Sequence, residues 1–330
     1  MSNEKVLRLK DIYDSFFKYM SERLIGMDDI IKKTFITFLS KGHLLIEGPP
    51  GLGKTTFVKH FSKYFDLEFS RVQFTPDLMP LDIIGSNIIE EEERKKAFKF
   101  YKGPIFANIV LGDEINRATP KTQSACLEAM EEKRITFLGT TYPLPDPFMI
   151  IATQNSIELE GTYPLPEAQI DRFFMKLYVD YPEFKLLKEV VQKNEIIQTE
   201  KEKEIKSSFP YKNLEELLDL EKEVIVLDEL RQLISYIVVQ THPDKSESEL
   251  VKNYVLYGAS PRAAIALIRG AKWNALIDGR LNLSFDDIVD LAYDILNHRI
   301  ILNFEGESSA INKQGIVEDL IYRAKRQYSL

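Results

Sequence analysis

Residues 48–56 read Gly48-Pro49-Pro50-Gly51-Leu52-Gly53-Lys54-Thr55-Thr56, which matches the pattern G-x-x-x-x-G-K-[ST] of a phosphate-binding loop. The glycines let backbone N–H groups curl around a phosphate, Lys54 places a positive charge on its oxygens, and the Thr55 hydroxyl can ligate Mg²⁺. An apolar run, Leu44-Leu45-Ile46, precedes the loop and a helical pattern follows it. We therefore predict that residues 48–56 bind a nucleoside triphosphate.

Helical and extended patterns surround this loop. Apolar residues recur at helical spacing through residues 10–40 and are interrupted at Leu24-Ile25-Gly26, which predicts two helices that meet at a turn. Residues 43–47 predict a buried strand, a helix after the loop ends near Tyr64, and residues 69–74 alternate as in a second strand. A strand, a helix and a strand in this order favour a right-handed crossover, so we expect a parallel sheet covered by helices on both faces.

Two further apolar runs end in residues suited to hydrolysis. The run 109–112 leads directly to Asp113 and Glu114, and the run 148–153 ends two residues before Asn155. Strand ends of an α/β sheet present residues to a ligand. We predict that Asp113 holds Mg²⁺ through its water shell and that Glu114 orients and partly deprotonates the attacking water. Asn155 can hold a water or a γ-phosphate oxygen without adding charge.

Two segments between these strands have the pattern of β-hairpins. Residues 83–102 contain two β-rich halves on either side of the charge run 90–96. This run is either a polar loop at the hairpin tip or a contact for a partner. Residues 134–145 predict a second hairpin, which follows a helix predicted at 120–132. Cys126 lies in that helix and is most simply a small core residue.

The chain is predicted to form two domains. Residues 1–182 are expected to form an α/β nucleotide-binding domain, 183–212 a helix and linker, and 213–330 an all-α domain. Helices of the second domain are predicted at 227–241, 261–277, 285–299 and 316–326. Ser260 and a proline begin the second of these, which leaves Arg262 in the first turn, where the helix dipole disfavours a cation. The charge of Arg262 is therefore predicted to serve something outside its helix.

Composition limits the class of protein. A chain of 330 residues with 44% hydrophobic content can form two cores. Its 43 basic and 51 acidic residues give a net charge of −8, which argues against extensive contact with nucleic acid. A single cysteine, no signal-peptide pattern and no apolar run near the ~18 residues of a membrane span predict a cytoplasmic protein with no direct membrane insertion. The four histidines lack metal-ligand spacing, so we predict no zinc site.

Together these motifs resemble the AAA+ ATPases, and within them the MoxR family, from about residue 20 to 300. Besides the phosphate loop, the resemblance rests on Gln73-Phe74-Thr75-Pro76-Asp77-Leu78-Met79-Pro80, Asp82-Ile83-Ile84-Gly85, Gly103-Pro104-Ile105-Phe106-Ala107-Asn108, Asp113-Glu114-Ile115-Asn116-Arg117-Ala118, Ala152-Thr153-Gln154-Asn155, residues 161–173 and Gly258-Ala259-Ser260-Pro261-Arg262-Ala263. Two departures are small. Gly112 stands where a larger apolar residue is more usual, and the chain beyond Asn303 is less typical.

The resemblance implies a P-loop AAA+ domain with a parallel sheet, flanking helices and β-hairpin inserts, followed by an all-α helical lid domain. It also implies the role of each predicted site residue. Lys54 and Thr55 would form the Walker A pair, Asp113 and Glu114 the Walker B pair, and Asn155 would be the sensor-1 residue.

Two arginines and one turn also match the family. Arg172 corresponds to the arginine finger that a neighbouring subunit supplies, and Arg262 to the sensor-2 arginine, which would report the nucleotide state to the lid. Ile25-Gly26 resembles the turn on the adenine side, although it also serves as a simple helix-linking turn. The hairpins at 83–102 and 134–145 correspond to the helix-2 insert and the pre-sensor-1 insert, which face the pore or a client in related rings.

The implied function is that of a ring-forming ATPase. We expect a homo-oligomer, taken as a hexameric ring, that binds ATP or ADP with Mg²⁺ and remodels a protein client, such as a protein with a von Willebrand factor A domain. The main alternative is a subunit of a DNA-associated AAA+ motor, against which the net charge argues. Small-molecule phosphotransfer and an assembly switch with negligible turnover are two others. The strand-end residues argue against the first and Glu114 against the second.

Overall fold

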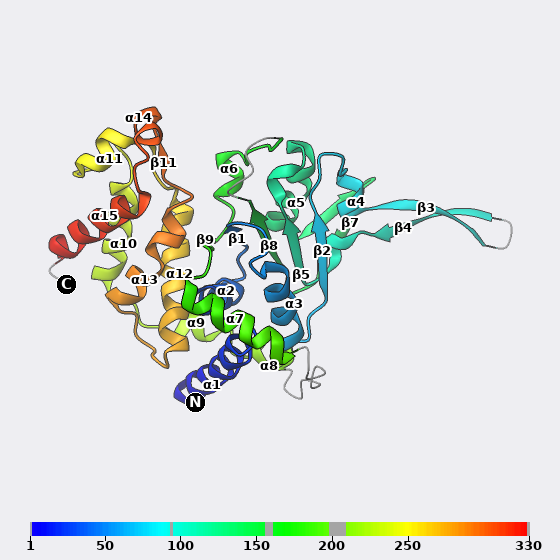
Figure 1. Ribbon diagram of the computed structural model, residues 1–330, viewed down its shortest axis with the longest axis horizontal. Coiled ribbons are helices and arrows are strands. Elements are labelled where there is room, and N and C mark those ends of the chain that lie inside the picture. Colours follow the sequence, from blue (N-terminus) through cyan, green and yellow to red (C-terminus); the bar gives the residue numbers. More distant parts are fainter. Residues whose placement is uncertain (1, 93–94, 156–160, 198–208, 329–330) are drawn as a thin grey trace.

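The computed structural model describes residues 2–92, 95–155, 161–197 and 209–328. Figure 1 shows a helical C-terminal lid on one side, an α/β domain around a central sheet, and a long hairpin that projects away from the lid. The predicted fold class, a P-loop α/β domain with hairpin inserts followed by a helical lid, is confirmed.

Two N-terminal helices cover one face of the sheet. α1 (Ser2–Ser21) and α2 (Asp28–Leu39) are the two helices predicted for this part of the chain. The ring of Phe16 in α1 stacks on Phe35 of α2 with centroids 5.1 Å apart, and it meets a phenylalanine of α3 (Lys54–Tyr64) edge-on at 5.5 Å. Aromatic pairs of this kind contribute ~0.5–1.5 kcal/mol beyond the area they bury. The cluster therefore fixes α3, which begins at the phosphate loop.

The central sheet has five parallel strands in the order β2–β5–β8–β1–β9. These are β1 (Leu44–Glu47), β2 (Phe69–Gln73), β5 (Ile109–Asp113), β8 (Met149–Gln154) and β9 (Met175–Tyr178). Alternate residues enter two apolar clusters, because helices cover both faces. Leu44 packs with α1–α3, whereas Leu45 packs with α5 (Pro120–Glu132), which also contains the buried Cys126. Polar side chains gather at the carboxyl ends of the strands.

Two antiparallel hairpins extend from the α/β domain, as predicted. The long hairpin consists of β3 (Gly85–Glu92) and β4 (Lys95–Lys102), and the short hairpin of β6 (Arg134–Phe137) and β7 (Thr140–Pro143). Phe100 of β4 stacks on Tyr142 of β7 with ring centroids 4.4 Å apart. The two inserts therefore support each other near the base of the long hairpin. Residues 93–94 of the charge run 90–96 lie outside the described residues.

One prediction beside the long hairpin is wrong in detail. Ile83-Ile84 was expected to begin a strand, but these residues end a short helix, α4 (Pro80–Ile84). A proline opens this helix, and the backbone N–H of Met79 donates to the Asp82 carboxylate at 2.8 Å. These helix-start signals outweigh the β propensity of two isoleucines. The strand begins at Gly85 instead.

The remaining short elements join the strands of the α/β domain. They are η1 (Pro104–Phe106), η2 (Ile115–Arg117) and α6 (Glu167–Ile170). The segment after η2 leads to α5, whose bounds match the predicted helix. The segment after α6 carries Arg172 toward β9, so the predicted loop and short helix before the last strand are present.

The lid is helical, as predicted, with one exception. Its helices are α9 (Leu220–Glu223), α10 (Asp228–Gln240), α11 (Glu249–Tyr254), α12 (Pro261–Ile277), α13 (Phe285–Leu296), α14 (Phe304–Ser308) and α15 (Lys313–Tyr328). The four predicted lid helices correspond to α10, α12, α13 and α15. A two-stranded ladder, β10 (Val255–Tyr257) with β11 (Ile301–Leu302), corrects the expectation that this part is helical throughout. Strands this short leave no alternation to recognise in a sequence.

Polar residues of α13 and the turn after it fasten the lid to the α/β domain. Asp294 pairs with Lys33 of α2 at 2.6 Å, and the two side chains are 9% and 10% exposed. Burial raises the pKa of Asp294 to about 6, an effect that the charge of Lys33 opposes. Nearby, Asn297 donates to the carbonyl of Lys176 in β9 at 2.9 Å. Removing one partner of this buried ion pair would leave an uncompensated charge, so the pair favours this packing of the lid on its own α/β domain.

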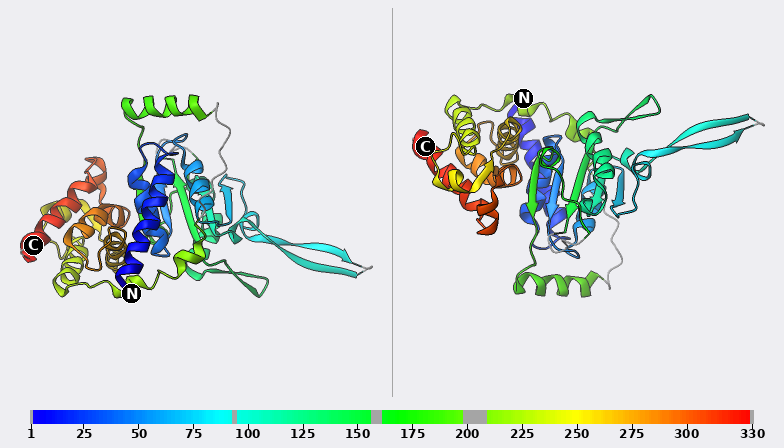
Figure 2. Two further views of the ribbon diagram at one scale, coloured as in Figure 1. Left: turned by 90° about the horizontal axis from the view of Figure 1, so that it is seen from below. Right: turned by 90° about the horizontal axis from the view of Figure 1, so that it is seen from above.

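The segment between the domains contains α7 (Phe184–Ile197) and α8 (Tyr211–Glu215). Both views in Figure 2 show α7 set apart from the lid and lying beside the α/β domain. Residues 198–208 of the predicted linker lie outside the described residues, and the predicted domain boundaries stay predictions. Within the described ranges, no helix is both long and apolar enough to cross a bilayer.

Candidate active site

The phosphate loop connects the end of β1 to the start of α3. Gly51 and Gly53 have φ angles of 83° and 78°, in the left-handed region where other residues are strained. A Cβ at either position would meet nothing within 4 Å, so the backbone conformation, rather than lack of space, requires glycine. A Cβ at Gly48 would lie 2.2 Å from the carbonyl oxygen of Val179. The loop therefore curls over the N-terminus of α3, which is a favourable place for an anion.

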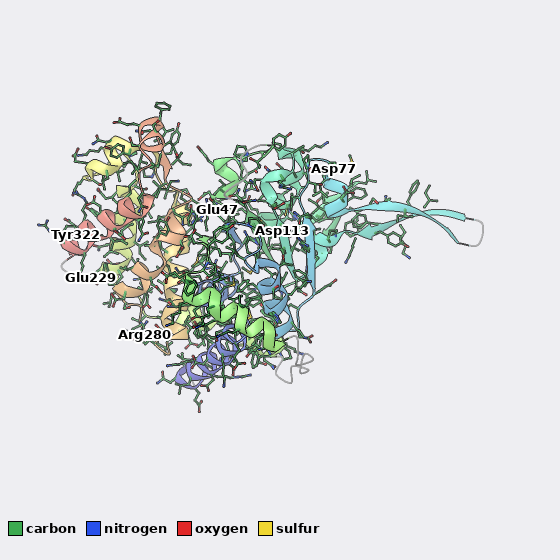
Figure 3. The ribbon with its side chains drawn as sticks, in the orientation of Figure 1. Glu47, Asp77, Asp113, Glu229, Arg280 and Tyr322 are labelled. Carbon is green, nitrogen blue, oxygen red and sulfur yellow. The ribbon has the colours of Figure 1, made fainter. Side chains whose placement is uncertain are left out.

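A cavity of about 400 Å³ lies beside this loop. Its lining residues are Gly48, Pro50, Gly51, Gly53, Lys54, Thr55, Thr56, Arg71, Gln73, Asp113, Glu114, Thr153 and Asn155. Of these, Arg71, Gln73 and Thr153 were missed as site residues. Pro49 and Leu52 do not line the cavity; Pro49 is buried, and Leu52 packs against the apolar core. In Figure 3, Glu47 and Asp113, the last residues of β1 and β5, both lie in the centre of the molecule.

Lys54 is buried within the loop. Its Nζ donates to the carbonyl oxygen of Gly48 at 2.6 Å. Burial lowers the pKa of Lys54, while Asp113, Glu114 and Glu47 act in the opposite direction. A phosphate in the cavity would further stabilise the charged lysine, because a nearby opposite charge favours the ionised form.

Thr153 of β8 connects the two predicted catalytic carboxylates. Its hydroxyl donates to Oδ1 of Asp113 at 2.7 Å and accepts the backbone N–H of Glu114 at 2.9 Å. Glu114 has a φ of 56°, which is uncommon for a residue other than glycine. Such conformations persist where surrounding contacts enforce them, and they cluster at active sites.

Two residues of β2, Arg71 and Gln73, donate hydrogen bonds to one oxygen each of Asp113 and Glu114. Arg71 donates to Oδ2 of Asp113 from Nε at 3.2 Å and from Nη2 at 2.6 Å, and Gln73 donates to Oε2 of Glu114 at 2.9 Å. Arg71 Nη2 also donates to Gln73 Oε1 at 2.7 Å. A signal for these residues exists in the sequence, since they alternate with the buried Val72 and therefore share one face of a strand.

The donor set of the cavity fits Mg²⁺. The Asp113 carboxylate and the Thr55 hydroxyl are hard oxygen donors that line the same cavity as Lys54. The described residues contain no group of three or more His, Cys, Asp or Glu side chains that could hold a metal. Mg²⁺ at a nucleotide site needs no such group, because phosphates and waters complete its shell. Asn155, at the end of β8, is 8% exposed and lines the same cavity.

Arg172 and Arg262 lie together, outside this cavity. Glu131 of α5 pairs with both, through Oε2 at 3.0 Å from Arg172 Nη2 and through Oε1 at 2.7 Å from Arg262 Nη2. Asp171 lies 3.6 Å from Arg262 Nη1 and accepts a hydrogen bond from Arg299 Nε at 2.8 Å. We call these five residues the arginine cluster. Its members come from both domains.

The arginine cluster borders a smaller cavity of about 230 Å³, which Lys41 and Arg269 also line. Burial lowers the pKa of the nearby Lys133; the charges of Lys41 and Arg269 act in the same direction, and Asp146 opposes them. The partners of Arg262 belong to the α/β domain rather than to its own helix. The prediction that its charge serves something outside the helix is therefore confirmed. The finger and sensor-2 roles stay predictions.

The Ile25-Gly26 turn joins α1 to α2 and does not line the phosphate-loop cavity. Gly26 has a φ of 74°, and a Cβ there would lie 3.2 Å from a methyl carbon of Leu186 in α7. The turn is thus covered by the helix between the domains. Its predicted role on the adenine side stays a prediction.

Known families match both domains. Residues 43–175 match the model described as "ATPase family associated with various cellular activities (AAA)", and residues 247–320 match the AAA lid domain. The first range contains the phosphate loop, both carboxylates, Asn155 and Arg172, and the second contains Arg262.

Relatives match most of the chain. It is 38% identical over 299 residues to "Chaperone MoxR1" of Mycobacterium tuberculosis, covering 90% of this chain and 78% of that protein. It is 40% identical over 311 residues to the protein YeaC of Bacillus subtilis, covering 93% and 92%. A crystal structure of a Cytophaga hutchinsonii protein assigned as an ATPase superposes with a TM-score of 0.86 at 39% identity, covering 97% of this chain and 96% of that one.

Proposed function

Because the chain belongs to the MoxR family of AAA ATPases and is an ATP hydrolase, we propose that it works as a ring, taken as a hexamer, whose subunits share their active sites. In this ring, Mg²⁺-dependent hydrolysis of ATP would remodel or mature a protein client. The proposal includes the use of both ATP and ADP as ligands and a cytoplasmic location.

The observation that carries the proposal is the separation of two charged sites in one chain. The phosphate-loop cavity contains the groups that hold and attack a nucleotide, but Arg172 and Arg262 do not line it. These arginines instead share Glu131. An arginine supplied by a neighbouring subunit can raise the rate of phosphoryl transfer by ~10³ or more. A ring in which each arginine cluster meets the next subunit's cavity would complete every site.

Within one subunit, each cavity residue would have a defined task. Lys54 would bind the phosphate oxygens, and Asp113 and Thr55 would hold Mg²⁺, which supplies charge neutralisation when bound. Glu114 would orient the attacking water and accept its proton, after its contact with Gln73 opens. Asn155 would position the water or a γ-phosphate oxygen.

The neighbouring subunit would supply the remaining positive charge. Arg172 would leave Glu131 for the γ-phosphate, which carries more charge than a carboxylate. Arg262 pairs with the same glutamate, so we place it beside Arg172 on the same γ-phosphate. Because Arg262 begins a lid helix, its contact would also report the nucleotide state to the lid.

The hairpins supply a surface for the client. Ile89 and Phe98 form an exposed cross-strand pair on the long hairpin, and Leu138 is exposed at the turn of the short hairpin. A protein client, such as one with a von Willebrand factor A domain, is the partner we propose. A DNA-associated motor remains the alternative, and stimulation of hydrolysis by DNA that falls with added salt would favour it.

The shared-site proposal is tested by measuring steady-state ATPase activity per chain across a dilution series. Activity per chain should fall on dilution, because a dissociated subunit lacks the arginines of its neighbour. Sedimentation at the same concentrations reports the state of assembly. A rate that does not depend on dilution, while assembly does, would contradict the proposal.

The client is sought with Glu114→Gln, which should bind ATP but hydrolyse it slowly. Proteins retained from a native lysate with ATP are compared with those retained without nucleotide, and wild-type protein with ADP is the control. A protein retained only with ATP supports client remodelling. If nucleic acid is retained instead, the DNA-motor alternative takes its place.

A further inference from the structure

Arg71 occupies the carboxylate that the proposed function assigns to Mg²⁺. Its guanidinium donates to Oδ2 of Asp113 from Nε at 3.2 Å and from Nη2 at 2.6 Å. The second oxygen, Oδ1, accepts the hydroxyl of Thr153 at 2.7 Å. Both oxygens of Asp113 are therefore already in use by donors of the protein.

The sheet itself places Arg71 beside Asp113. β2 pairs with β5 in parallel, with Arg71 opposite Leu111 and Gln73 opposite Asp113. Alternate residues of a strand share a face, so Arg71 and Gln73 lie on the same side of β2. Each contacts one carboxylate at the end of β5. A cation taken up by Asp113 would therefore compete with contacts that the two strands set up.

The ion pair is not needed to hold β2 in the sheet. The backbone ladder joins β2 to β5 across five residue pairs, from Phe69 to Gln73. The Arg71 side chain is 46% exposed, and ion pairs this exposed contribute little to stability. The guanidinium can thus leave Asp113 at little cost to the fold, and Arg71 is one of the residues that line the phosphate-loop cavity.

We propose that Arg71 competes with Mg²⁺ for Asp113 and thereby sets how strongly nucleotide binding depends on the metal. The inference rests on the proposed role of Asp113 in holding Mg²⁺. Two effects act in the same direction. Arg71 occupies one oxygen of the carboxylate that would hold the hydrated metal, and its positive charge favours nucleotide phosphates that carry no metal. Arg71 is in this sense a positioning residue of the nucleotide site.

The test is calorimetric titration of ADP with excess Mg²⁺ and again with a chelator. The dissociation constant of ADP with chelator, divided by that with Mg²⁺, measures the coupling between metal and nucleotide. Arg71→Gln should raise this ratio by about threefold to fivefold, the scale expected for one exposed ion pair. Arg71→Lys keeps the charge but loses the paired hydrogen bonds from Nε and Nη2 to Asp113. Its ratio should therefore lie between those of wild type and Arg71→Gln.

Arg117→Gln is the matched control. Arg117 pairs with Glu114 at 3.3 Å, so its loss removes a nearby positive charge and leaves the contact between Arg71 and Asp113 in place. Because Arg117 does not line the cavity, this variant should change the ratio less than Arg71→Gln does. Thermal unfolding of every variant, followed by circular dichroism, checks that the fold is kept.

Asp113→Ala separates this inference from the proposed function. It should bring the ratio close to one. If it leaves the wild-type ratio, the assignment of Asp113 to Mg²⁺ is wrong and the inference falls with it. If Asp113→Ala removes the coupling but Arg71→Gln leaves it unchanged or lowers it, the inference alone is overturned.

Discussion

The phosphate-loop cavity and the arginine cluster contain similar charged groups in opposite arrangements. In the cavity, a buried lysine and two carboxylates face a space of about 400 Å³ beside a glycine-rich loop. In the cluster, three arginines pair with only two carboxylates, Glu131 and Asp171, and the glutamate is 45% exposed. One region has room for a phosphate, and the other has cations that an incoming anion can attract. Under the shared-site proposal, the difference means that neither region alone is a complete hydrolytic site.

The two regions also differ in how the fold builds them. The cavity is lined by residues of the α/β domain alone, at strand ends that parallel pairing brings together. The cluster lies between the two domains, because Glu131 and Asp171 belong to the α/β domain while Arg262 and Arg299 belong to the lid. Any movement of the lid would therefore change the cluster more directly than the cavity.

The largest expected effect is that of Arg172→Ala, which should lower the ATPase rate of the assembled protein by ~10³. The cavity does not contain Arg172, so ATP affinity of the dilute protein should stay close to wild type. The matched control is Arg134→Ala, because Arg134 also pairs with a glutamate, Glu132, at 2.8 Å. A similar loss of activity in both variants would mean that Arg172 has no special role.

Glu114→Gln should lower the rate by ~10², the scale of losing a general base, and should leave ATP bound. Fluorescent ATP binding and single-turnover hydrolysis separate the two effects. Unlike Arg172→Ala, this variant should be impaired through its own cavity. Weak ATP binding by Glu114→Gln would contradict the assignment of Glu114 to the chemical step.

Glu131→Gln should raise the turnover number by about twofold to fivefold, because Arg172 then breaks no ion pair to reach the γ-phosphate. Glu131 holds both arginines at hydrogen-bonding distance, but exposed ion pairs contribute only ~0.2–1 kcal/mol each. Glu132→Gln is the control, because its partner Arg134 lies in the short hairpin. The effect of Glu131→Gln should vanish in an Arg172→Ala background, and equal effects in both backgrounds would show that Glu131 acts elsewhere.

The last expected effect is on stability in acid rather than on activity. Burial lowers the pKa of His43 to about 4, and in the unfolded chain it is ~6.5. His43 is neutral in the fold, where it accepts the backbone N–H of Ile150 at 2.9 Å. Its stabilising contribution is present above pH ~6.5 and is lost as pH falls from there toward 4, by up to ~3 kcal/mol.

Urea unfolding at pH 7.5 and pH 5.0 measures this loss. His43→Asn should reduce the difference between the two pH values. The control is His242→Asn, since His242 is only partly buried and contacts the carbonyl of Ala259 instead. An unchanged difference in His43→Asn would exclude His43 as a source of acid sensitivity.

The cavity could largely be predicted from the sequence. Apolar runs indicate the strands at 44–46, 109–112 and 148–153, and a polar residue or the phosphate loop follows each of them. Asp113, Glu114 and Asn155 meet the phosphate loop as expected. Arg71 could not be assigned, because alternation indicates a strand but does not indicate which neighbour its polar face meets. Gly112 departs from the family pattern, and the structure supplies a reason, since a Cβ there would lie 3.2 Å from the ring of Phe74.

The ion pairs of the arginine cluster could not be predicted from the sequence, for a different reason. The placement of Arg262 at a helix start indicated an outside partner, but the partner, Glu131, is 131 residues away and lies in the other domain. Long-range ion pairs of this kind depend on how two domains pack. For the same reason, the sequence did not indicate the buried ion pair of Lys33 and Asp294, which joins the two domains.

The central claim, that one subunit's cavity uses another subunit's arginines, is tested most directly by mixing two inactive variants. Glu114→Gln and Arg172→Ala are co-expressed with different tags, and assemblies that contain both are purified through the two tags in turn. In a ring with head-to-tail contacts, about a quarter of the sites would join an intact cavity to an intact arginine. The account predicts activity near that fraction of wild type. Mixed assemblies as inactive as either variant alone would contradict it.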